Sequence, residues 1–284
     1  MAIQISIDRN VVNALSLEML RNKFLPALRQ NKIIVHLMDT FLGELFSDDN
    51  SGRRARHADI FQKIFNGKII LSLPQLISSE LQGKNELFYN NKIEARIRRV
   101  LDYIAQRKLS IKARQQKIKE ARRFYNEDLK NRQEDKLITL KSYIKKKLED
   151  KEIDKELLKQ SKKATFEEYY AGCPNEWKWR KLKRFLEVNK ISYKGDISQY
   201  LDNKNYPCSN FWLRSWFGYH YYTVQRGQFT LRKNDASDLD YIVSAYYLDY
   251  FITNDEALRN IGNLVSNSVD KYIAWDDFES RFIK

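Results

Sequence analysis

Acidic side chains stand directly after two short strand-like runs that lie at opposite ends of this chain. Residues 3–7 alternate apolar and polar side chains and lead into Asp8, whereas residues 250–253 form a β-rich run that leads into Asp255. Just before the second run, Asp238 lies in a segment with helical spacing of its apolar residues. Because ligands bind at the carboxyl ends of parallel strands in open α/β sheets, these carboxylates are expected to meet at one edge.

Several carboxylates at one edge repel one another, and a bound cation relieves that repulsion. Carboxylate oxygens prefer hard ions such as Mg²⁺ or Mn²⁺. Such an ion lowers the pKa of water and neutralises charge on a phosphodiester in the transition state. The competing interpretation is structural, because an Asp before a helix commonly caps it and an Asn-Asp pair after a strand commonly forms a turn.

A fourth acid is expected from a second strand–helix unit, and the sequence offers two candidates. Residues 33–37 form a continuous β-branched run followed by a helix that carries Glu44, while residues 68–73 precede a helix that carries Glu80. The residue pattern alone leaves both glutamates open. A similar choice exists between Asp238 and Asp240, since residues two apart point about 200° apart on a helix and cannot both face one site.

This ordered set of motifs resembles the PIN-domain nuclease superfamily. Asp8-Arg9-Asn10 matches the Asp-x-Asn that ends the first strand of that family, and Thr253-Asn254-Asp255 matches its Thr-x-Asp before a helix. The resemblance covers roughly residues 3–85 and 232–284 and not the middle of the chain.

The resemblance implies metal-dependent hydrolysis that leaves a 5′-phosphate and a 3′-hydroxyl, usually on single-stranded or structured RNA. It assigns Mg²⁺ or Mn²⁺ to four ligands, bound directly or through water, and gives two further residues the role of orienting them. The ligands are Asp8, Glu44, Asp238 and Asp255, and the orienting residues are Asn10 and Thr253. The alternative is a non-catalytic nucleic-acid-binding protein with a PIN-like fold.

The positive charge of the chain lies in its middle third. The 284 residues contain 51 Lys and Arg and 37 Asp and Glu, a net charge of +14. Residues 91–190 hold 30 of these bases and 16 of the acids, so the remainder is balanced at 21 each. Such asymmetry favours a polyanionic partner, most often nucleic acid, and the resemblance favours RNA over DNA. A solvated Lys- and Glu-rich helical surface is the simpler alternative.

Particular cations in this region are candidates for contacts with nucleic acid. Some follow a helical pattern from residue 93 onward, and others alternate with tryptophans in residues 176–181, as in phosphate-binding and base-stacking surfaces. The candidates are Arg98, Arg99, Arg122, Arg123, Lys178 and Arg180. The same helices are also a candidate surface for a protein partner or a second copy of the chain.

The strand-like runs at 3–8, 33–37, 68–73, 250–253 and 272–275 each adjoin a helical pattern. They predict an α/β fold, a three-layer α/β/α PIN-like domain with a parallel sheet and a large basic α-helical insertion. We expect the PIN-like domain to comprise residues 1–88 and 200–284, and the insertion to comprise residues 89–199.

Smaller features complete the prediction. Pro26 is expected to break the helix over residues 16–29, residues 47–58 are expected to form a polar loop, and residues 211–222 are expected to form a buried aromatic helix. Two cysteines form no disulfide framework or zinc motif, and no apolar run is long enough to span a membrane. These features predict a cytoplasmic protein without membrane contact.

Overall fold

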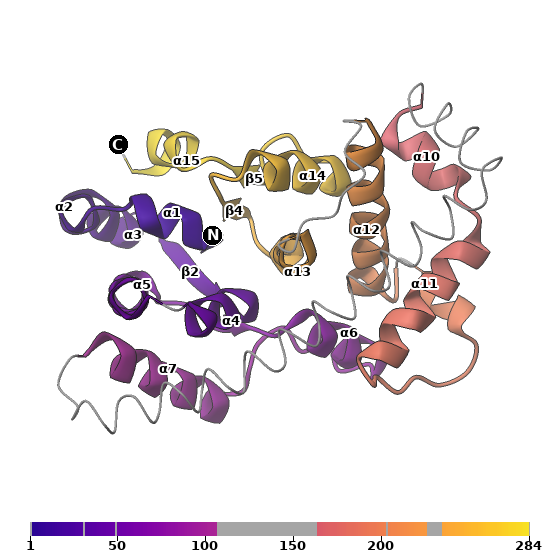
Figure 1. The fold of residues 1–284 in the computed structure, drawn as a ribbon, viewed down its shortest axis with the longest axis horizontal. Coiled ribbons are helices and arrows are strands. Elements are labelled where there is room, and N and C mark those ends of the chain that lie inside the picture. Colours follow the sequence, from indigo (N-terminus) through magenta and orange to yellow (C-terminus); the bar gives the residue numbers. More distant parts are fainter. Residues whose placement is uncertain are drawn as a thin grey trace.

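A computed structural model describes residues 2–30, 32–48, 50–106, 164–202, 204–225 and 235–283. Its centre is a five-stranded, entirely parallel sheet with the strand order β3-β2-β1-β4-β5. Figure 1 labels β2, β4 and β5 of this sheet. The strands are β1 (Ile3–Ile7), β2 (Ile33–Met38), β3 (Ile69–Ile70), β4 (Tyr250–Ile252) and β5 (Tyr272–Ile273). The predicted α/β fold with a parallel sheet is therefore confirmed, and all five strand-like runs contribute to it.

Helices connect these strands and continue beyond them. Before β4 the described helices are α1 (Arg9–Ala14), α2 (Leu17–Met19), α3 (Leu25–Gln30), α4 (Asp39–Ser47), α5 (Ser51–Ile64), α6 (Leu73–Leu81), α7 (Asn91–Ala105), α10 (Phe166–Gly172), α11 (Asn175–Val188), α12 (Pro207–Gln225) and α13 (Asp235–Ser244). After β4 they are α14 (Glu256–Ser266) and α15 (Trp275–Phe282). A π-helical turn spans Leu20–Phe24, and 3₁₀ turns span Ile197–Leu201 and Ala245–Tyr247.

The pairing of β1 with β4 joins the two ends of the chain. Ile5 pairs with Tyr250 and Ile7 pairs with Ile252, and the amide of Asp8 donates to the carbonyl of Ile252 at 2.8 Å. This register places the residue after β1 beside the residue after β4. Segments about 240 positions apart in the sequence therefore meet at the carboxyl edge of the sheet.

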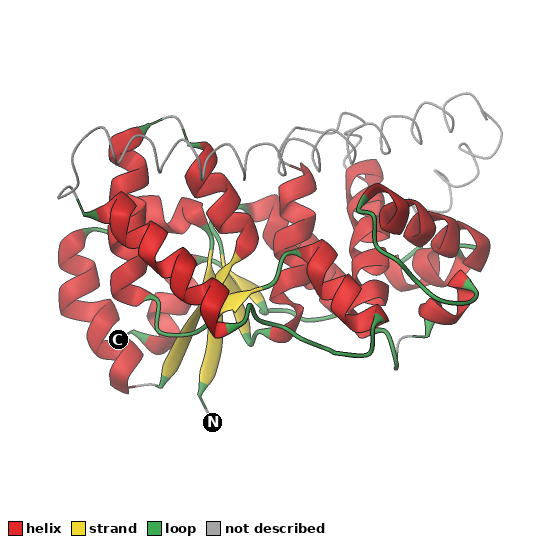
Figure 2. Cartoon of the chain, turned by 90° about the horizontal axis from the view of Figure 1, so that it is seen from below, coloured by secondary structure: helices red, strands yellow, loops and turns green. Residues whose placement is uncertain are grey.

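Helices lie on both faces of the sheet (Figure 2). Neighbouring residues of β4 show this directly, because successive side chains of a strand point to opposite faces. Tyr250 packs against Phe282 of α15 at 5.3 Å between ring centroids, while Phe251 packs against Tyr241 of α13 at 5.4 Å. This arrangement is compatible with a three-layer α/β/α fold.

β3 is shorter than the run of residues 68–73 predicts, because a helix start interrupts it. Ser72 and Gln75 form a capping box, and Pro74 stands in the first turn of α6, where its missing amide hydrogen is not needed. Local capping therefore ends the strand after Ile70.

Two expectations about the first third of the chain need correction or refinement. The predicted polar loop over residues 47–58 is wrong from Ser51 onward, because α5 begins there and buries Arg54, His57 and Ala58. The break expected near Pro26 takes the form of the π-helical turn just before α3, which fits a proline that lacks an amide donor.

The described parts of the predicted insertion are helical and pack on the rest of the chain. α7 lies against α5 and buries Ile97, Leu101 and Ile104 in the core, while α10 and α11 lie against α12. Among the described residues, no helix has both the length and the apolar character needed to cross a membrane.

Candidate functional site

Asp8 is held at the carboxyl end of β1 by the hydroxyl group of Thr253, which follows β4. Thr253 Oγ1 accepts the amide hydrogen of Asp255 at 3.1 Å and lies 3.3 Å from the donating Nδ2 of Asn10. Its own hydrogen is then directed to Asp8 Oδ2 at 2.6 Å. Because this hydroxyl donates, it favours an ionised Asp8 in a fixed rotamer. Burial nevertheless raises the pKa of Asp8, and the charge of Asp255 adds to that rise.

Asp255 lies next to this pair and also caps α14. Its Oδ1 accepts the amide hydrogen of Leu258 at 2.9 Å, which is the usual role of an Asp at a helix start. Asn10 ties the two motifs together, since its Oδ1 also accepts the amide hydrogen of Asn254 at 3.1 Å. The two segments that carry the resemblance are thus joined by direct hydrogen bonds.

Glu44 of α4 approaches the same edge from β2. Burial, and then the negative charge of Asp8, raise the pKa of Glu44 from its ordinary value of 4.5 to about 7. The hydroxyl of Tyr241 donates to Glu44 Oε2 at 3.1 Å, and this bond and the charge of Arg9 oppose that rise. The charge of Asp255 therefore acts on Asp8, and the charge of Asp8 acts on Glu44.

Arg9 connects this edge with α4 and α5. Its Nε donates to Nδ1 of His57 at 3.1 Å, its Nη1 donates to the carbonyl oxygen of Glu44 at 3.1 Å, and its Nη2 pairs with Asp48. His57 must accept at Nδ1, so it is neutral. Burial and the charges of Arg9 and other nearby arginines lower the pKa of His57 to about 4, in agreement with that role. Arg9 thereby holds the backbone of Glu44 beside Asp8.

α13 supplies Tyr241 and the remaining predicted acid. Asp238 is half-buried and stands three residues before Tyr241, so both lie on the same side of α13. Asp240 is fully buried about 200° around the helix from Asp238. Asp238 thus shares the helix side that faces Glu44. It lies in the first turns of α13, which begins at Asp235.

Glu80 lies elsewhere, at the start of α12. Its carboxylate accepts the amide hydrogens of Cys208 and Ser209, at 2.5 and 2.9 Å, and the hydroxyl hydrogen of Ser209. These bonds satisfy amide groups that have no partner within the helix. The structure thus brings Glu44 to Asp8 and gives Glu80 a capping role.

Two carboxylates at this edge, those of Asp8 and Glu44, have the oxygen ligands that a hard divalent ion prefers. No three His, Cys, Asp or Glu side chains of the described part of the chain are grouped closely enough to hold a metal ion among themselves. Mg²⁺, however, usually keeps several waters and takes one or two carboxylates plus substrate phosphates. Asp8 and Glu44 provide two such carboxylates whose charges disfavour each other, and Asp255 stands beside them.

The predicted nucleic-acid contacts fall into four groups. Arg98 is bound within the fold, because its guanidinium pairs with Glu94, donates to the carbonyl of Gly67 at 2.8 Å and stacks on Phe65 at 3.9 Å. Arg99 is exposed, and Arg180 is exposed and paired with Glu176. Lys178 is half-buried against Tyr170. Arg122 and Arg123 lie outside the described residues.

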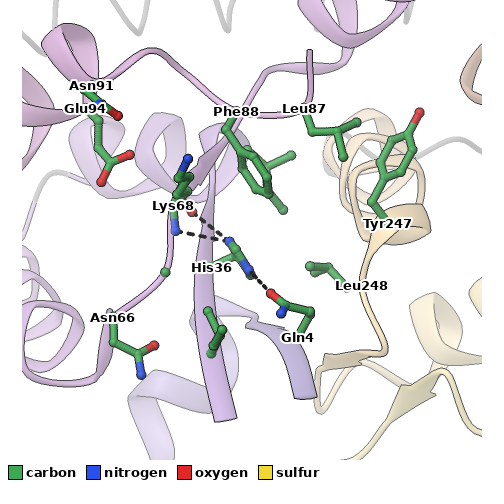
Figure 3. A pocket seen from close by; sticks show the side chains of 13 residues that line it. Gln4, His36, Asn66, Lys68, Leu87, Phe88, Asn91, Glu94, Tyr247 and Leu248 are labelled. Atoms are coloured by element: carbon green, nitrogen blue, oxygen red, sulfur yellow. Dashed lines mark hydrogen bonds between the residues drawn. The ribbon is translucent and has the colours of Figure 1, made fainter. Parts of the chain in front are cut away.

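A pocket of about 600 Å³ is lined by residues of β1 and β2 and of the segments beside them (Figure 3). Asp8, Glu44 and Asp255 do not line it. His36 lies in it, stacked on Phe88 at 5.1 Å, with Nε2 bonded to Gln4 and Nδ1 3.1 Å from the donating amide of Lys68. Burial lowers the pKa of His36, so the ring is a neutral, fully bonded group. The histidine in this pocket thus holds neighbouring segments together, and we assign it no catalytic role.

Sequence patterns did not indicate Tyr241, Arg9, His57 or Asp39 as parts of this edge. Asp39 follows β2 directly and is buried, with Oδ1 accepting from the hydroxyl of Tyr89 at 3.0 Å. Its position after a strand was the one available signal, since it repeats the placement of Asp8 and Asp255. Comparison of the chain with models of protein families, with curated proteins and with solved structures finds no match.

Proposed function

We propose that this chain is a divalent-metal-dependent nuclease that hydrolyses phosphodiester bonds, with RNA as its substrate. The observation that supports this most strongly is the joining of Asp8, Glu44 and Asp255 from three distant segments at one edge of a parallel sheet. Burial and nearby negative charge disfavour the ionised forms of Asp8 and Glu44, which is the electrostatic setting that a cation relieves. The resemblance to PIN-domain nucleases and the basic middle third support the same proposal.

In this proposal, Asp8 and Glu44 bind Mg²⁺ or Mn²⁺, with Asp255 and Asp238 acting directly or through water. The bound ion would lower the pKa of water and neutralise charge on the phosphodiester. Thr253 keeps Asp8 ionised and oriented by donating to it, and Asn10 keeps Thr253 in place. Residues that orient ligands in this way typically contribute about 10–100-fold in metal affinity or activity.

Protons and bonds balance without a protein nucleophile. Water attacks phosphorus, the bond to the 3′-oxygen breaks, and the products are a 5′-phosphate and a 3′-hydroxyl. The proton of the attacking water needs an acceptor near neutral pH. Solvent would take this proton and supply one to the leaving 3′-oxygen, because Glu44, as a ligand of the cation, and the neutral Tyr241 hydroxyl that donates to it are not available to accept one.

The test is a nuclease assay on single-stranded RNA, single-stranded DNA and duplex DNA with Mg²⁺, with Mn²⁺ and with a chelator. We expect RNA cleavage that needs either metal and leaves 5′-phosphate ends. Asp8→Asn should lower the rate by more than about 100-fold, beyond the range of a residue that only orients a ligand. Its thermal unfolding should stay near that of the wild type, because Asn can still accept from Thr253.

Two results would reject the proposal. Cleavage in the presence of a chelator would remove the role of the metal, and full activity of Asp8→Asn would remove the role of this edge. Tight binding of nucleic acid without any cleavage would favour the alternative, a non-catalytic binding protein. The absence of a compact three-ligand group among the described residues is the observation in favour of that alternative.

A further inference from the structure

A second polar pocket, of about 540 Å³, lies among α10, α11, α12 and the end of α14. Lys178, Arg214 and Lys271 line it, and Glu167 is the carboxylate among its lining residues. Side-chain amides of Asn175, Asn210 and Asn267 and the rings of Tyr170, Phe211 and Tyr246 complete much of the wall. The lining therefore combines cations, amides and rings.

Lys178 and Lys271 are cations that the fold partly removes from water. The ammonium of Lys178 lies 4.3 Å from the ring centroid of Tyr170, and that of Lys271 donates to the carbonyl oxygen of Tyr246 at 2.8 Å. Burial lowers the pKa of both lysines, which is opposed for Lys271 by the charge of Asp249. Within the described residues, neither ammonium forms an ion pair with a carboxylate.

Arg214 is fixed rather than available. Its Nε donates to the carbonyl oxygen of Val265, its two terminal nitrogens pair with Glu167, and its plane lies over Phe166 and Tyr170 at 4.8 and 5.5 Å. Since Glu167 neutralises Arg214, the lining keeps the two positive charges of Lys178 and Lys271. A partly buried cation that forms no ion pair is unfavourable by itself and complementary to an anion.

We propose that this pocket binds a phosphate group, carried either by a free nucleotide or by the backbone of a nucleic acid. Two ammonium groups match the two negative charges of a phosphate monoester or of two consecutive phosphodiesters. The side-chain amides of Asn175 and Asn267 can donate to the remaining oxygens, whereas that of Asn210 already donates to the carbonyl oxygens of Tyr200 and Tyr206. Arg180 on the same helix is not part of this pocket, since it pairs with Glu176 on the outer surface.

The position of α14 relates this pocket to the acidic edge. Asp255 caps the start of α14, and Ser266 at its end lines the pocket. With 11 residues, α14 is about 16 Å long at 1.5 Å per residue. One nucleic acid strand could therefore contact both regions. Binding of a nucleic acid strand in this pocket rests on the proposed nuclease function, whereas binding of a free nucleotide does not.

The test measures binding of inorganic pyrophosphate, a nucleoside triphosphate and a short single-stranded RNA to the full chain by calorimetry, without divalent metal so that no cleavage occurs. The double variant Lys178→Ala/Lys271→Ala should bind at least about tenfold more weakly, as expected for the loss of charge-assisted hydrogen bonds. Lys183→Ala, which removes an exposed lysine from the same helix, is the matched control and should bind as the wild type does.

Glu167→Gln keeps the test decisive if the lysine variants fail to fold. This change removes the carboxylate that neutralises Arg214, so affinity for all three probes should rise. Unchanged binding in the double variant, an equal loss in Lys183→Ala, or no gain in Glu167→Gln would each overturn the phosphate pocket. Asp8→Asn should not alter binding of pyrophosphate, so failure of the nuclease proposal would remain distinguishable.

The probes also separate the two sources. Binding of pyrophosphate and the triphosphate that is as tight as binding of RNA would identify a nucleotide pocket. RNA that binds more tightly, with a salt dependence that weakens in the double variant, would identify a strand contact, because each lost phosphate contact lowers the slope of log K against log salt by about 0.7. Both outcomes support a phosphate site.

Discussion

The acidic edge of the sheet and the basic pocket at the end of α14 each gather side chains of like charge, negative at the edge and positive in the pocket. At the edge, burial and nearby negative charge disfavour the ionised forms of Asp8 and Glu44, and Asp255 is one source of that charge. In the pocket, the partly buried Lys178 and Lys271 carry the opposite charge. α14 runs from one region to the other.

The supporting contacts differ between the two regions. Hydrogen-bond donors with fixed orientation, the hydroxyls of Thr253 and Tyr241, hold the carboxylates in place. In the pocket, the ammonium group of Lys178 lies over the ring of Tyr170, and that of Lys271 donates to a backbone carbonyl. A ring contact constrains the position of an ammonium group less than a hydrogen bond to a carboxylate does. Directional bonds suit a metal ion, which demands defined ligand positions, whereas ring contacts suit a flexible phosphate chain. The contrast predicts strict side-chain requirements at the edge and tolerant ones in the pocket.

The largest effect that tests this contrast is expected at Asp255, which has two roles. Asp255→Asn should keep the cap of α14, since Asn is as good an N-cap as Asp, but should lower the rate of RNA cleavage by more than about 100-fold. Asp255→Ala should lower the rate similarly and also destabilise the fold by about 1 kcal/mol. Cleavage rates and urea unfolding of the two variants separate the roles.

Asp196 offers a control for the cap alone, because it caps the 3₁₀ turn at Ile197–Leu201 through Ser198 and stands away from the edge. Asp196→Ala should reduce stability without reducing the rate of cleavage by the remaining folded enzyme. If Asp255→Asn retains full activity, Asp255 is only a cap, and the strict requirement at the edge is refuted.

The sheet was predictable because its strands are encoded locally. Each of the five strand-like runs is short, apolar and followed by a helix pattern, which is sufficient to indicate parallel strands with crossover helices. The start of α5 was not, since residues 47–58 are polar and rich in arginine. Its helical state depends on tertiary contacts, namely the packing of His57 and the bonds of Arg54 and Arg56 to neighbouring backbone carbonyls.

The candidate site was predictable only in part for a related reason. Asp8 and Asp255 could be found because each follows a strand, and the sheet register then brings them together. Tyr241 and Arg9 could not, because an aromatic residue in an apolar helix and an arginine after a strand have many structural roles. What distinguishes them is the partner that each reaches, Glu44 in both cases. Tyr241 reaches it through the packing of α13 on α4, and Arg9 reaches it from the start of α1.

The next effect concerns the pH dependence of stability. Because folding raises the pKa of Glu44 from 4.5 to about 7, the folded protein retains a proton in this interval that the unfolded chain has lost. The contribution of Glu44 to stability is therefore full below about pH 4.5 and declines as pH rises to 7. Glu44→Gln imitates the protonated form, so it should be more stable than the wild type at pH 8 by on the order of 2 kcal/mol and nearly equal at pH 4.5.

Urea unfolding at the two pH values, with and without Mg²⁺, measures this difference. Mg²⁺ should stabilise the wild type at pH 8 and narrow its gap to Glu44→Gln, since the ion binds the carboxylate that the variant lacks. Glu86→Gln, at an exposed position, is the matched control and should show no pH-dependent gap. A difference in stability between Glu44→Gln and the wild type that is equal at both pH values would contradict a raised pKa of Glu44.

The smallest effect concerns two neighbouring arginines that sequence patterns could not tell apart. Arg98 is tied to Glu94, to the carbonyl of Gly67 and to the ring of Phe65, so Arg98→Ala should destabilise the fold by about 1 kcal/mol. Arg99 is exposed, and Arg99→Ala should change stability by less than about 0.5 kcal/mol. If α7 contacts RNA through its exposed side, Arg99→Ala should instead weaken RNA binding and lower its salt slope by about 0.7. Thermal unfolding and RNA titrations at several salt concentrations compare the two variants directly. Equal loss of RNA affinity in both would show that α7 acts through its total charge, and unchanged affinity in Arg99→Ala would remove this residue from the nucleic-acid surface.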